Sequence, residues 1–476
     1  MLSDTVNPQK SLAHLTAWYQ AVHSRLQALA QEPATTLGTL EATLENAARE
    51  LFGPLLQPAM QTMANATARL CPVCREPLQI EARNKPRTVT HLWGDSLLLR
   101  DYGWCVQCQD WFYPADHRLG LGPYAPASPR VQEIAALMTL KMPSAQAEAV
   151  AARVTGLSLS RSTLDREAHR QGVRAQALRE AEVALIQTPQ GVACLAGRAR
   201  PKLPNQPFTL IIQVDAFNIR ERDHWGQTQW RRKKGLDIPR WHWVYVGTCF
   251  RLDQRVQTAS GRPVITERGY VATRLGLEAF GHQMYAEAIL RGLTQADKVL
   301  VIADGALWIW HWAEDRLEFA THLVDLWHVK QHLWAVANEL HGPDSPQTRQ
   351  WITPLFTQLE KRSDGAAKVI ARLECLRQIT PSLTNAQQAA LDKEINYLKA
   401  NQNRMNYAGA RAAGEPVGSG PVESTCRQYQ CRFKRPGQFW SLAGDEPLLA
   451  LETLYRNERW DQLFPHAKSS ASLNNN

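Results

Sequence analysis

Acidic residues follow apolar, strand-like runs at three places in the second half of the chain. FTLIIQVDAF carries Asp215, KVLVIADG carries Asp304, and FATHLVDLWH carries Asp325 with His328 three residues later. The apolar runs predict buried strands, and each carboxylate is expected at the end of its strand. If these strands are neighbours in one sheet, the carboxylates meet, and such hard oxygen ligands suit a hard cation. The pattern predicts an acidic site that holds a cation.

A fourth acidic residue, Glu423, lies in GEPVGSGPVESTCRQYQCRFKR, where glycine and proline lead into a helix. Each acidic residue also has a simpler explanation. Asp304-Gly305 is a common turn pair, Asp215 could simply end a strand, and Glu423 stands where a glutamate often caps its own helix. The spacing of Asp325 and His328 fits a pair near the site, or a histidine that locks a strand-helix corner.

The elements that must position these residues begin after a proline- and glycine-rich stretch over 188–207, which is typical of a linker. Strands are predicted over 208–215, 241–250 and 264–273, then a helix over 275–293 and strands from 299 and 319. Three strands, a helix and two more strands are the order of a ribonuclease H-like α/β core, expected over 205–328. A helical, charged region predicts an all-α insertion over 329–410. The core would finish over 411–465 with the Glu423 helix, before a low-complexity, disordered tail at 466–476.

Four of the nine cysteines form two CxxC pairs, Cys71/Cys74 and Cys105/Cys108. Two such knuckles around a short alternating segment are typical of a zinc ribbon, expected over 66–118. The Zn²⁺ would be structural, because four thiolates leave no open coordination position. A redox CxxC pair or a chance spacing are the alternatives. Tight pairs of cysteines favour a metal site in a reducing compartment over a disulfide framework.

Two helical regions flank this ribbon. Residues 1–65 have helical spacing and predict a helical hairpin for packing or self-association. Residues 119–187 contain AEAVAARVTGLSLSRSTLDREAHRQG, which is similar to a helix-turn-helix, with a first helix ending near Thr155-Gly156 and a second capped by Ser160 or Ser162. The second helix would carry a basic DNA-reading face with Arg161, Arg166 and Arg170; a solvated helical pair is the alternative.

The chain has 476 residues, of which 44% are apolar and 21% charged, as in a folded globular protein of several domains. Lys and Arg outnumber Asp and Glu by nine, so a polyanion such as nucleic acid is the favoured partner. Basic residues that could contact phosphate follow the first core strand and the Glu423 helix: Arg231, Arg232, Lys233, Lys234, Arg427, Arg432, Lys434 and Arg435. A solvated turn is an equal explanation for the run at 231–234. No signal peptide and no long apolar run predict a cytosolic protein without a membrane partner.

Four segments together carry a family resemblance: VDAF, VLVIADGALWIW, DLWH, and GSGPVESTCR followed by FKRPGQFWS. Over about residues 205–460 the chain resembles the DDE transposases of bacterial insertion sequences, in particular the Kra-type group akin to the Mutator superfamily. The resemblance implies a catalytic triad of Asp215, Asp304 and Glu423, with Asp325 and His328 as the accessory C/D-x-x-H pair.

This resemblance implies DNA strand cleavage and transfer with two Mg²⁺ ions, which activate the attacking water or 3′-hydroxyl and stabilise the leaving oxygen. The implied partners are double-stranded DNA, as the element's terminal repeats and as target, and further copies of the chain in a homodimer or higher oligomer on DNA. The implied location is the bacterial cytoplasm, at the nucleoid. Two alternatives stay open: an inert or regulatory DNA-binding protein derived from a transposase, and a metal-dependent nuclease of the same fold.

Overall fold

The computed structural model describes residues 8–465, except residues 124, 223–225, 237–239, 344 and 442, and it leaves out the side chains of residues 8–12 and 14. The expected disordered tail at 466–476 therefore lies outside the described residues. Within them the chain forms two compact units, residues 1–168 and 169–476, and the division falls inside helix α6 (Arg161–Leu185). The predicted division into seven segments is finer than these two units and stays a prediction.

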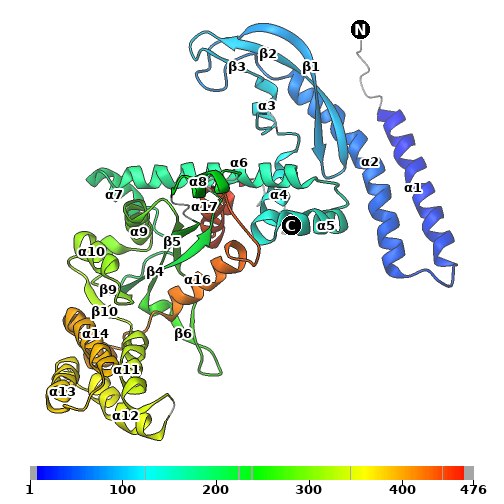
Figure 1. Cartoon of the computed structure of the whole chain (residues 1–476). Coiled ribbons are helices and arrows are strands. Elements are labelled where there is room, and N and C mark those ends of the chain that lie inside the picture. The colour runs from blue at the N-terminus through cyan, green and yellow to red at the C-terminus, as the bar shows by residue number, and fades with distance from the viewer. Residues whose placement is uncertain are drawn as a thin grey trace. The chain divides into compact units, whose positions relative to one another are not determined.

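The first unit begins with two long helices, α1 (Pro8–Ala30) and α2 (Leu37–Asn65), as expected for a helical hairpin (Figure 1). An antiparallel sheet of β1 (Gln79–His91), β2 (Gly94–Cys105) and β3 (Asp110–Phe112) follows. The rest is helical: α3 (Pro114–Arg118), α4 (Pro129–Lys141), α5 (Ser144–Thr155) and the start of α6. Ala135, Ala147 and Leu164 bring the last three of these helices together in a small buried cluster.

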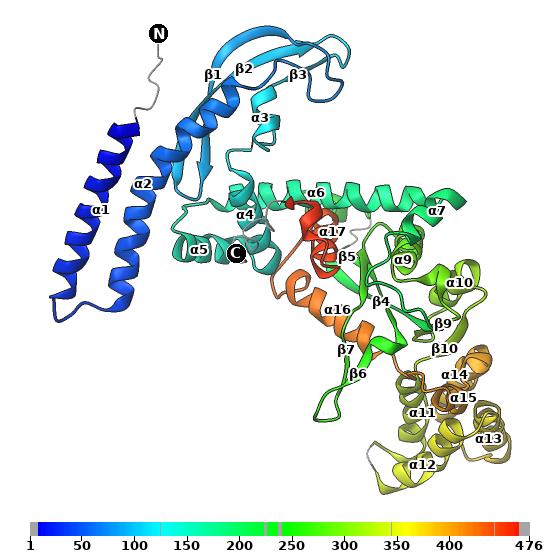
Figure 2. The same cartoon turned by 180° about the vertical axis from the view of Figure 1, so that it is seen from behind.

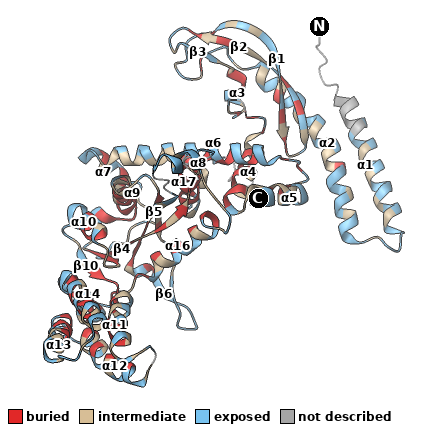
Figure 3. Ribbon diagram, in the orientation of Figure 1, coloured by how far each residue is buried: buried red, intermediate tan, exposed pale blue. Residues whose placement is uncertain are grey.

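The second unit is built on a mixed five-stranded sheet in the order β10-β9-β4-β5-β8. Its strands are β4 (Thr209–Arg220), β5 (Trp241–Arg251), β8 (Gly269–Thr273), β9 (Lys298–Ala303) and β10 (Thr321–Val324). The first three form an antiparallel meander, whereas β9 and β10 run parallel to β4. Buried residues gather along these strands (Figure 3): residues 210–214 of β4 and 299–303 of β9 are all buried.

Helices cover both faces of this sheet. Gly247 of β5 leaves room for Met284 and Phe280 of α9 (Leu277–Leu290), whereas Gln213 of β4 is hydrogen-bonded to α16 (Gly420–Phe433) and the residues just before it. Gly247 pairs with Val214, the neighbour of Gln213. Successive strand residues face opposite sides, so α9 and α16 pack on opposite faces.

The remaining elements surround this core. They are α7 (Pro189–Ala196), α8 (Thr228–Lys233), η1 (Leu252–Gln254), η2 (Leu293–Gln295), α10 (Leu307–Arg316), α17 (Asp445–Arg456) and η4 (Trp460–Gln462). The residues described between 326 and 412 contain helices and no strand: α11 (Leu326–His341), α12 (Pro346–Lys361), α13 (Gly365–Ile379), α14 (Asn385–Asn401), η3 (Gln402–Arg404) and α15 (Tyr407–Ala412). The helices predicted over 329–410 are therefore present, and their role as an insertion in a larger core stays a prediction.

Two predicted elements differ from the structure. The stretch 188–207 is not a linker throughout, because α7 occupies its first half and Leu195 is fully buried in the core of the second unit. The strand expected over 264–273 is divided: β7 (Pro263–Ile265) pairs with β6 (Arg255–Gln257) in a hairpin, and only β8 joins the sheet. Both views show this hairpin projecting beside α16 (Figures 1 and 2).

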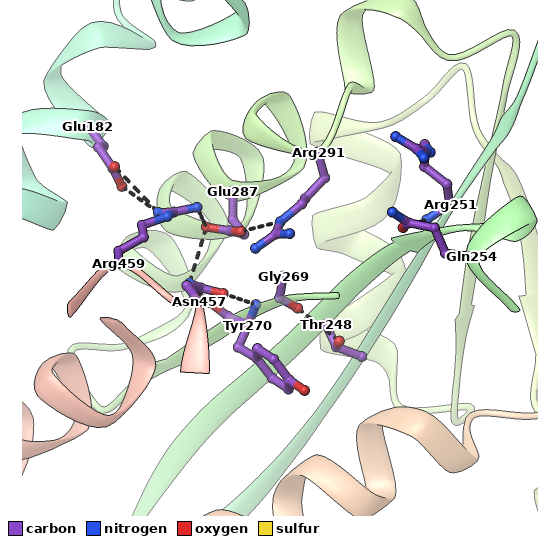
Figure 4. A network of polar contacts seen from close by, with 10 residues as sticks. All are labelled: Glu182, Thr248, Arg251, Gln254, Gly269, Tyr270, Glu287, Arg291, Asn457 and Arg459. Carbon is purple, nitrogen blue, oxygen red and sulfur yellow. Dashed lines mark hydrogen bonds and ion pairs between the residues drawn. The ribbon is translucent and has the colours of Figure 1, made fainter. Parts of the chain in front are cut away.

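A buried polar network ties the C-terminal segment to the sheet (Figure 4). Arg459 contacts Glu182 of α6 at 3.2 Å and Glu287 of α9 at 2.6 Å. The side-chain amide of Asn457 accepts from Tyr270 N of β8 at 2.8 Å and donates to Tyr270 O at 2.9 Å. A buried charge needs such partners, because an unpaired one carries a desolvation penalty of several kcal/mol. The network therefore holds α6, α9 and the chain end against β8.

Candidate functional site

The sheet places Asp215 and Asp304 side by side. Strands β4 and β9 are parallel neighbours, and Val214 pairs with Ala303, so each aspartate stands one residue beyond the last pair. Neighbouring strands lie about 4.8 Å apart. Asp215 does not end its strand, as the sequence had suggested, because β5 continues to pair with β4 as far as Arg220. Asp215 lies instead where the parallel pairing of β4 with β9 ends, so its carboxylate stands beside the C-terminal end of β9.

Helix α16 brings Glu423 to the same place. The side chain of Gln213, two residues before Asp215 on β4, donates to Gly418 O at 3.1 Å and accepts from Val422 N at 3.2 Å. These two bonds anchor the start of α16 on the sheet face that Asp215 also occupies. One turn after Glu423, the buried thiol of Cys426 interacts with Asp215, and burial and that carboxylate raise the pKa of Cys426. Asp215 and Glu423 therefore border the same end of the sheet.

The structure supports the simpler explanation offered for Asp304, a turn residue, but not the one offered for Glu423, a helix cap. Asp304 Oδ1 accepts from Ala306 N at 2.9 Å, so this residue does stabilise its turn, but its second oxygen has no hydrogen bond from any described residue. Glu423 does not close a capping box, because the backbone N–H of Ser419 donates to Asp325 instead. Its carboxylate lies 3.3 Å from Ser419 Oγ, whose single proton is donated to the nearer carboxylate of Asp325. Both side chains keep oxygen atoms available for a cation.

The charges of these groups act on one another. Burial raises the pKa of Asp215, and the negative charge of Asp304 raises it further. The pKa of His328 is raised, first by Asp325 and then by the charges of Asp304 and Glu423. Carboxylates brought together in a partly buried place repel each other, and a bound cation relieves that repulsion. The field of this cluster therefore favours a positive ion.

Asp325 is a fully buried residue whose carboxylate is saturated with hydrogen bonds. One oxygen accepts from Trp327 N at 2.6 Å and His328 N at 3.0 Å, which caps α11. The other accepts from the backbone N–H of Ser419 and from Ser419 Oγ at 2.7 Å. An ionised carboxylate offers about four acceptor sites, and all are used here. The geometry therefore favours the corner-locking role for Asp325 over direct metal binding.

His328 differs from Asp325 because it is only half-buried and its ring reaches the acidic cluster. Its Nδ1 lies 3.5 Å from Asp325 Oδ1. Among the described residues, Asp325, His328 and Glu423 have ligand atoms that all lie within 4.8 Å of one another. Because both oxygens of Asp325 already accept hydrogen bonds, His328 and Glu423 are the members of this group left to bind a metal ion. The predicted set of Asp215, Asp304 and Glu423 is not as compact as this group. His328 was predicted only as an accessory residue, and its position now makes it a candidate ligand.

Sequence reasoning missed Tyr397, which comes from α14 of the helical insertion. A methyl group added to Gly305 would lie 2.3 Å from the Tyr397 ring, so Gly305 permits the ring to approach the Asp304 turn. Burial, followed by the charges of Asp304 and Asp325, raises the pKa of Tyr397. Its buried hydroxyl lacks a hydrogen-bond partner among the described residues. Nothing in the helical pattern of α14 distinguished this residue from an ordinary packing tyrosine.

A cleft of about 780 Å³ opens beside the acidic group. One side is formed by the β6–β7 hairpin and the residues after it, including Arg255, Arg262 and Arg268. The other side is formed by α11 and the start of α16, including His328 and Glu423. His328 and Glu423 are therefore accessible from a cleft that is large enough for part of a substrate molecule.

The four predicted cysteine ligands of the first unit come together. Their sulfur atoms lie within 4.8 Å of one another, with Cys71–Cys108 at 3.8 Å and Cys74–Cys105 at 3.4 Å. A tetrahedral Zn²⁺ with Zn–S bonds of about 2.3 Å requires S–S separations of roughly 3.8 Å. All four thiols are free, and backbone N–H groups of Val73 and Cys108 point at two of the sulfurs. The set fits a structural zinc ion.

The helix-turn-helix-like region has the expected elements. Helix α5 ends at Thr155, Gly156 takes the left-handed conformation with φ 65°, and Ser160 Oγ accepts from Thr163 N at 3.3 Å. Ser160, and not Ser162, therefore caps the second helix. Arg161 forms an exposed ion pair with Glu148 at 2.7 Å, and Arg166 donates to Ser162 O at 3.1 Å. Both side chains are exposed, and Arg170 follows one turn later on the same helix.

The basic residues expected to contact phosphate in the second unit differ in exposure and in their contacts with other residues. Those at 231–234 lie on or just after the short helix α8, and three of the four are exposed. Arg427 is exposed, Lys434 donates to Asn218 at 2.9 Å, and Arg435 donates to Cys431 O at 2.8 Å. Arg432 is buried, with its guanidinium 5.1 Å from the Trp440 ring. We therefore assign Arg432 to packing and leave it out of any DNA-binding surface.

In comparisons with known proteins, no family model matches the chain, and no curated protein matches it in sequence. Among solved structures, the chain is similar to one from the "Drosophila P element transposase strand transfer complex", with 11% sequence identity and a TM-score of 0.23. The match covers 72% of this chain and 81% of that one. A TM-score this low does not establish a shared fold. Within the described residues, none of the helices combines the length and apolar character needed to cross a lipid bilayer.

Proposed function

We propose that this protein is a DDE-type DNA transposase that binds the ends of its element and catalyses strand cleavage and transfer. Asp215, Asp304 and Glu423 are the proposed catalytic carboxylates, and Mg²⁺ is the proposed catalytic metal. The single observation that carries the proposal is their convergence: two acidic residues from neighbouring parallel strands and one from a helix anchored on the same sheet face. The meander followed by two parallel strands supports a ribonuclease H-like core.

The donor set fits Mg²⁺. The groups left available around the cluster are carboxylate oxygens, which hard cations prefer over sulfur ligands. Asp215, Asp304 and Glu423 would hold the two ions, with His328 beside them, whereas the saturated Asp325 would fix the start of α11 and, through Ser419, the start of α16. Bound there, the ions would supply charge to activate the attacking oxygen and stabilise the leaving one.

The protein's own residues contribute positioning. Gln213 fixes the start of α16 through its two bonds and so sets where Glu423 stands relative to Asp215. Tyr397 packs against Gly305 and so helps to fix the turn that carries Asp304. We assign recognition of the element ends to the helix-turn-helix-like region and the Cys71–Cys108 zinc ribbon, because the carboxylates lie elsewhere in the chain. The proposed site of action is DNA in the bacterial cytoplasm.

The test is Mg²⁺-dependent cutting and joining of a labelled duplex that contains the sequences flanking the coding region. Asp304→Asn should lower the cleavage rate by about a thousandfold, corresponding to about 4 kcal/mol of lost transition-state stabilisation, while DNA binding is retained. Asp215→Asn and Glu423→Gln should behave alike. The matched control is Asp392→Asn, which alters an exposed ion pair of the helical insertion with Arg377.

The possible outcomes separate the alternatives. Cleavage without joining would favour the metal-dependent nuclease, and DNA binding by the wild type without Mg²⁺-dependent cleavage would favour the inert regulator. Substantial cleavage by a well-folded Asp304→Asn protein would disprove the assignment of the metal site.

A further inference from the structure

The β6–β7 hairpin carries three arginines toward the cleft beside the candidate metal group. Arg255 starts β6, Arg262 precedes β7, and Arg268 follows the hairpin; all three line the cleft. Arg255 and Arg262 are exposed, and Arg268 is half-buried with its guanidinium 5.7 Å from the Tyr270 ring. Among the described residues, none of the three guanidinium groups has an acidic partner. They are therefore positive charges left available to a ligand.

The opposite side of the same cleft carries one carboxylate and adjoins the acidic cluster. It includes Glu423 and the half-buried His328, with Asp304 close enough to raise the pKa of His328. Carboxylates alone would repel a polyanion over about 10 Å at moderate salt. A row of arginines facing them offsets that repulsion for a phosphate chain, while the carboxylates hold cations. The arginine side of the cleft can bind backbone phosphates, and the carboxylate side can hold metal ions. Such a cleft suits a DNA strand whose reacting phosphodiester is flanked by further phosphates.

The size of the cleft limits what fits. Its volume of about 780 Å³ is in the range of small-molecule sites, roughly 300–1,000 Å³, and not of a groove that holds a double helix. It therefore suits a short length of a single strand. Arginine is well matched to such a ligand because its planar guanidinium can donate two parallel hydrogen bonds to one phosphate.

We propose that the β6–β7 hairpin is a phosphate-binding arm that holds the DNA strand next to the reacting phosphodiester, with Arg255, Arg262 and Arg268 each contacting backbone phosphate. This inference rests on the proposed function, because it places the substrate strand between the hairpin and the acidic cluster. The arm binds without regard to base sequence, since it contacts only the backbone. It is separate from the residues assigned above to recognition of the element ends.

The experiment measures the affinity of the full-length protein for a fluorescent duplex with a single-stranded 3′ overhang, by anisotropy across a range of KCl concentrations. Ca²⁺ replaces Mg²⁺ so that no cleavage occurs. Each phosphate contact contributes about 0.7 to the slope of log K against log salt on single strands. The double variant Arg255→Gln/Arg262→Gln should lower the slope by about 1.4, and Arg268→Gln should lower it by about 0.7 further.

The matched control is Arg372→Gln, an exposed arginine of α13 in the helical insertion with no partner among the described residues. This control should bind with the wild-type slope. Because Arg255 and Arg262 are exposed, their double variant should melt like the wild type; if Arg268→Gln lowers the melting temperature through its contact with Tyr270, the double variant carries the test.

Two outcomes overturn the inference. If the wild type binds and cuts DNA but the double variant keeps the wild-type salt slope, the hairpin does not contact phosphate, while the proposed function stands. If the wild type neither binds nor cuts DNA, the proposed function fails and this inference fails with it. Cleavage assays on the same variants add a second readout: loss of the arm should raise KM at 150 mM KCl and leave the metal requirement unchanged.

Discussion

Replacing Asp325 with asparagine tests the role that the structure gives to this buried carboxylate. Asp325 accepts from Trp327 N and His328 N with one oxygen, and from the N–H and hydroxyl of Ser419 with the other. Asparagine keeps a single oxygen, so one of these two pairs would face an NH₂ group, which can only donate. The variant therefore loses two hydrogen bonds to an ionised group and sets at least one backbone N–H against the NH₂ group.

The size of the effect follows from two observations on Asp325. Hydrogen bonds to charged groups contribute about 1.5–3 kcal/mol each, so the loss of two costs roughly 3–6 kcal/mol. Its hydrogen bonds hold the pKa of Asp325 at about 2 against the opposing effect of burial, which corresponds to about 2 kcal/mol. The second figure is smaller because a protonated carboxyl still accepts hydrogen bonds with its carbonyl oxygen. We expect Asp325→Asn to lower the free energy of unfolding by about 3 kcal/mol.

Urea unfolding of the full-length protein, followed by circular dichroism and checked for an unchanged m-value, measures this loss. Asp304→Asn is the matched control, because the asparagine oxygen can still accept from Ala306 N and stability should change by less than about 0.5 kcal/mol. Activity should fall in both variants, but only Asp325→Asn should also unfold more easily. A loss below about 1 kcal/mol for Asp325→Asn would refute the corner-locking role and favour direct metal binding.

Two further predictions concern zinc and pH. Purified protein should contain one Zn²⁺ per chain, and Cys71→Ser should abolish its retention; elemental analysis that finds no stoichiometric zinc, or a disulfide in each CxxC pair, would contradict the ribbon. Burial and the charge of Glu221 raise the pKa of Asp445 to about 8, above its usual range, so the folded state binds this proton more tightly and stability should fall as pH rises from about 4 to 8. Asp445→Asn should remove that loss and melt higher than the wild type at pH 8, and parallel stability profiles from pH 4 to 8 would contradict the raised pKa of Asp445.

The sequence alone was sufficient for features set by local pattern. The apolar runs before Asp215 and Asp304 predicted β4 and β9, and the spacing of the cysteine pairs predicted four sulfurs that the structure brings together. The turn at Gly156 and the cap at Ser160 were also visible, because glycine tolerates the left-handed conformation and serine accepts from free helix N–H groups. These features depend on periodicity and backbone preference within a few residues.

Tertiary structure decided what depends on residues far apart in the chain. Asp325 became a saturated, buried carboxylate because Ser419, 94 residues later, donates to it from the start of α16. Tyr397 lies beside the Asp304 turn because its ring packs against Gly305. Arg432 is buried, and its guanidinium packs on the Trp440 ring. The type of a residue states which bonds it can make, but burial and the remaining partners determine which bonds form, and both are properties of the packed chain.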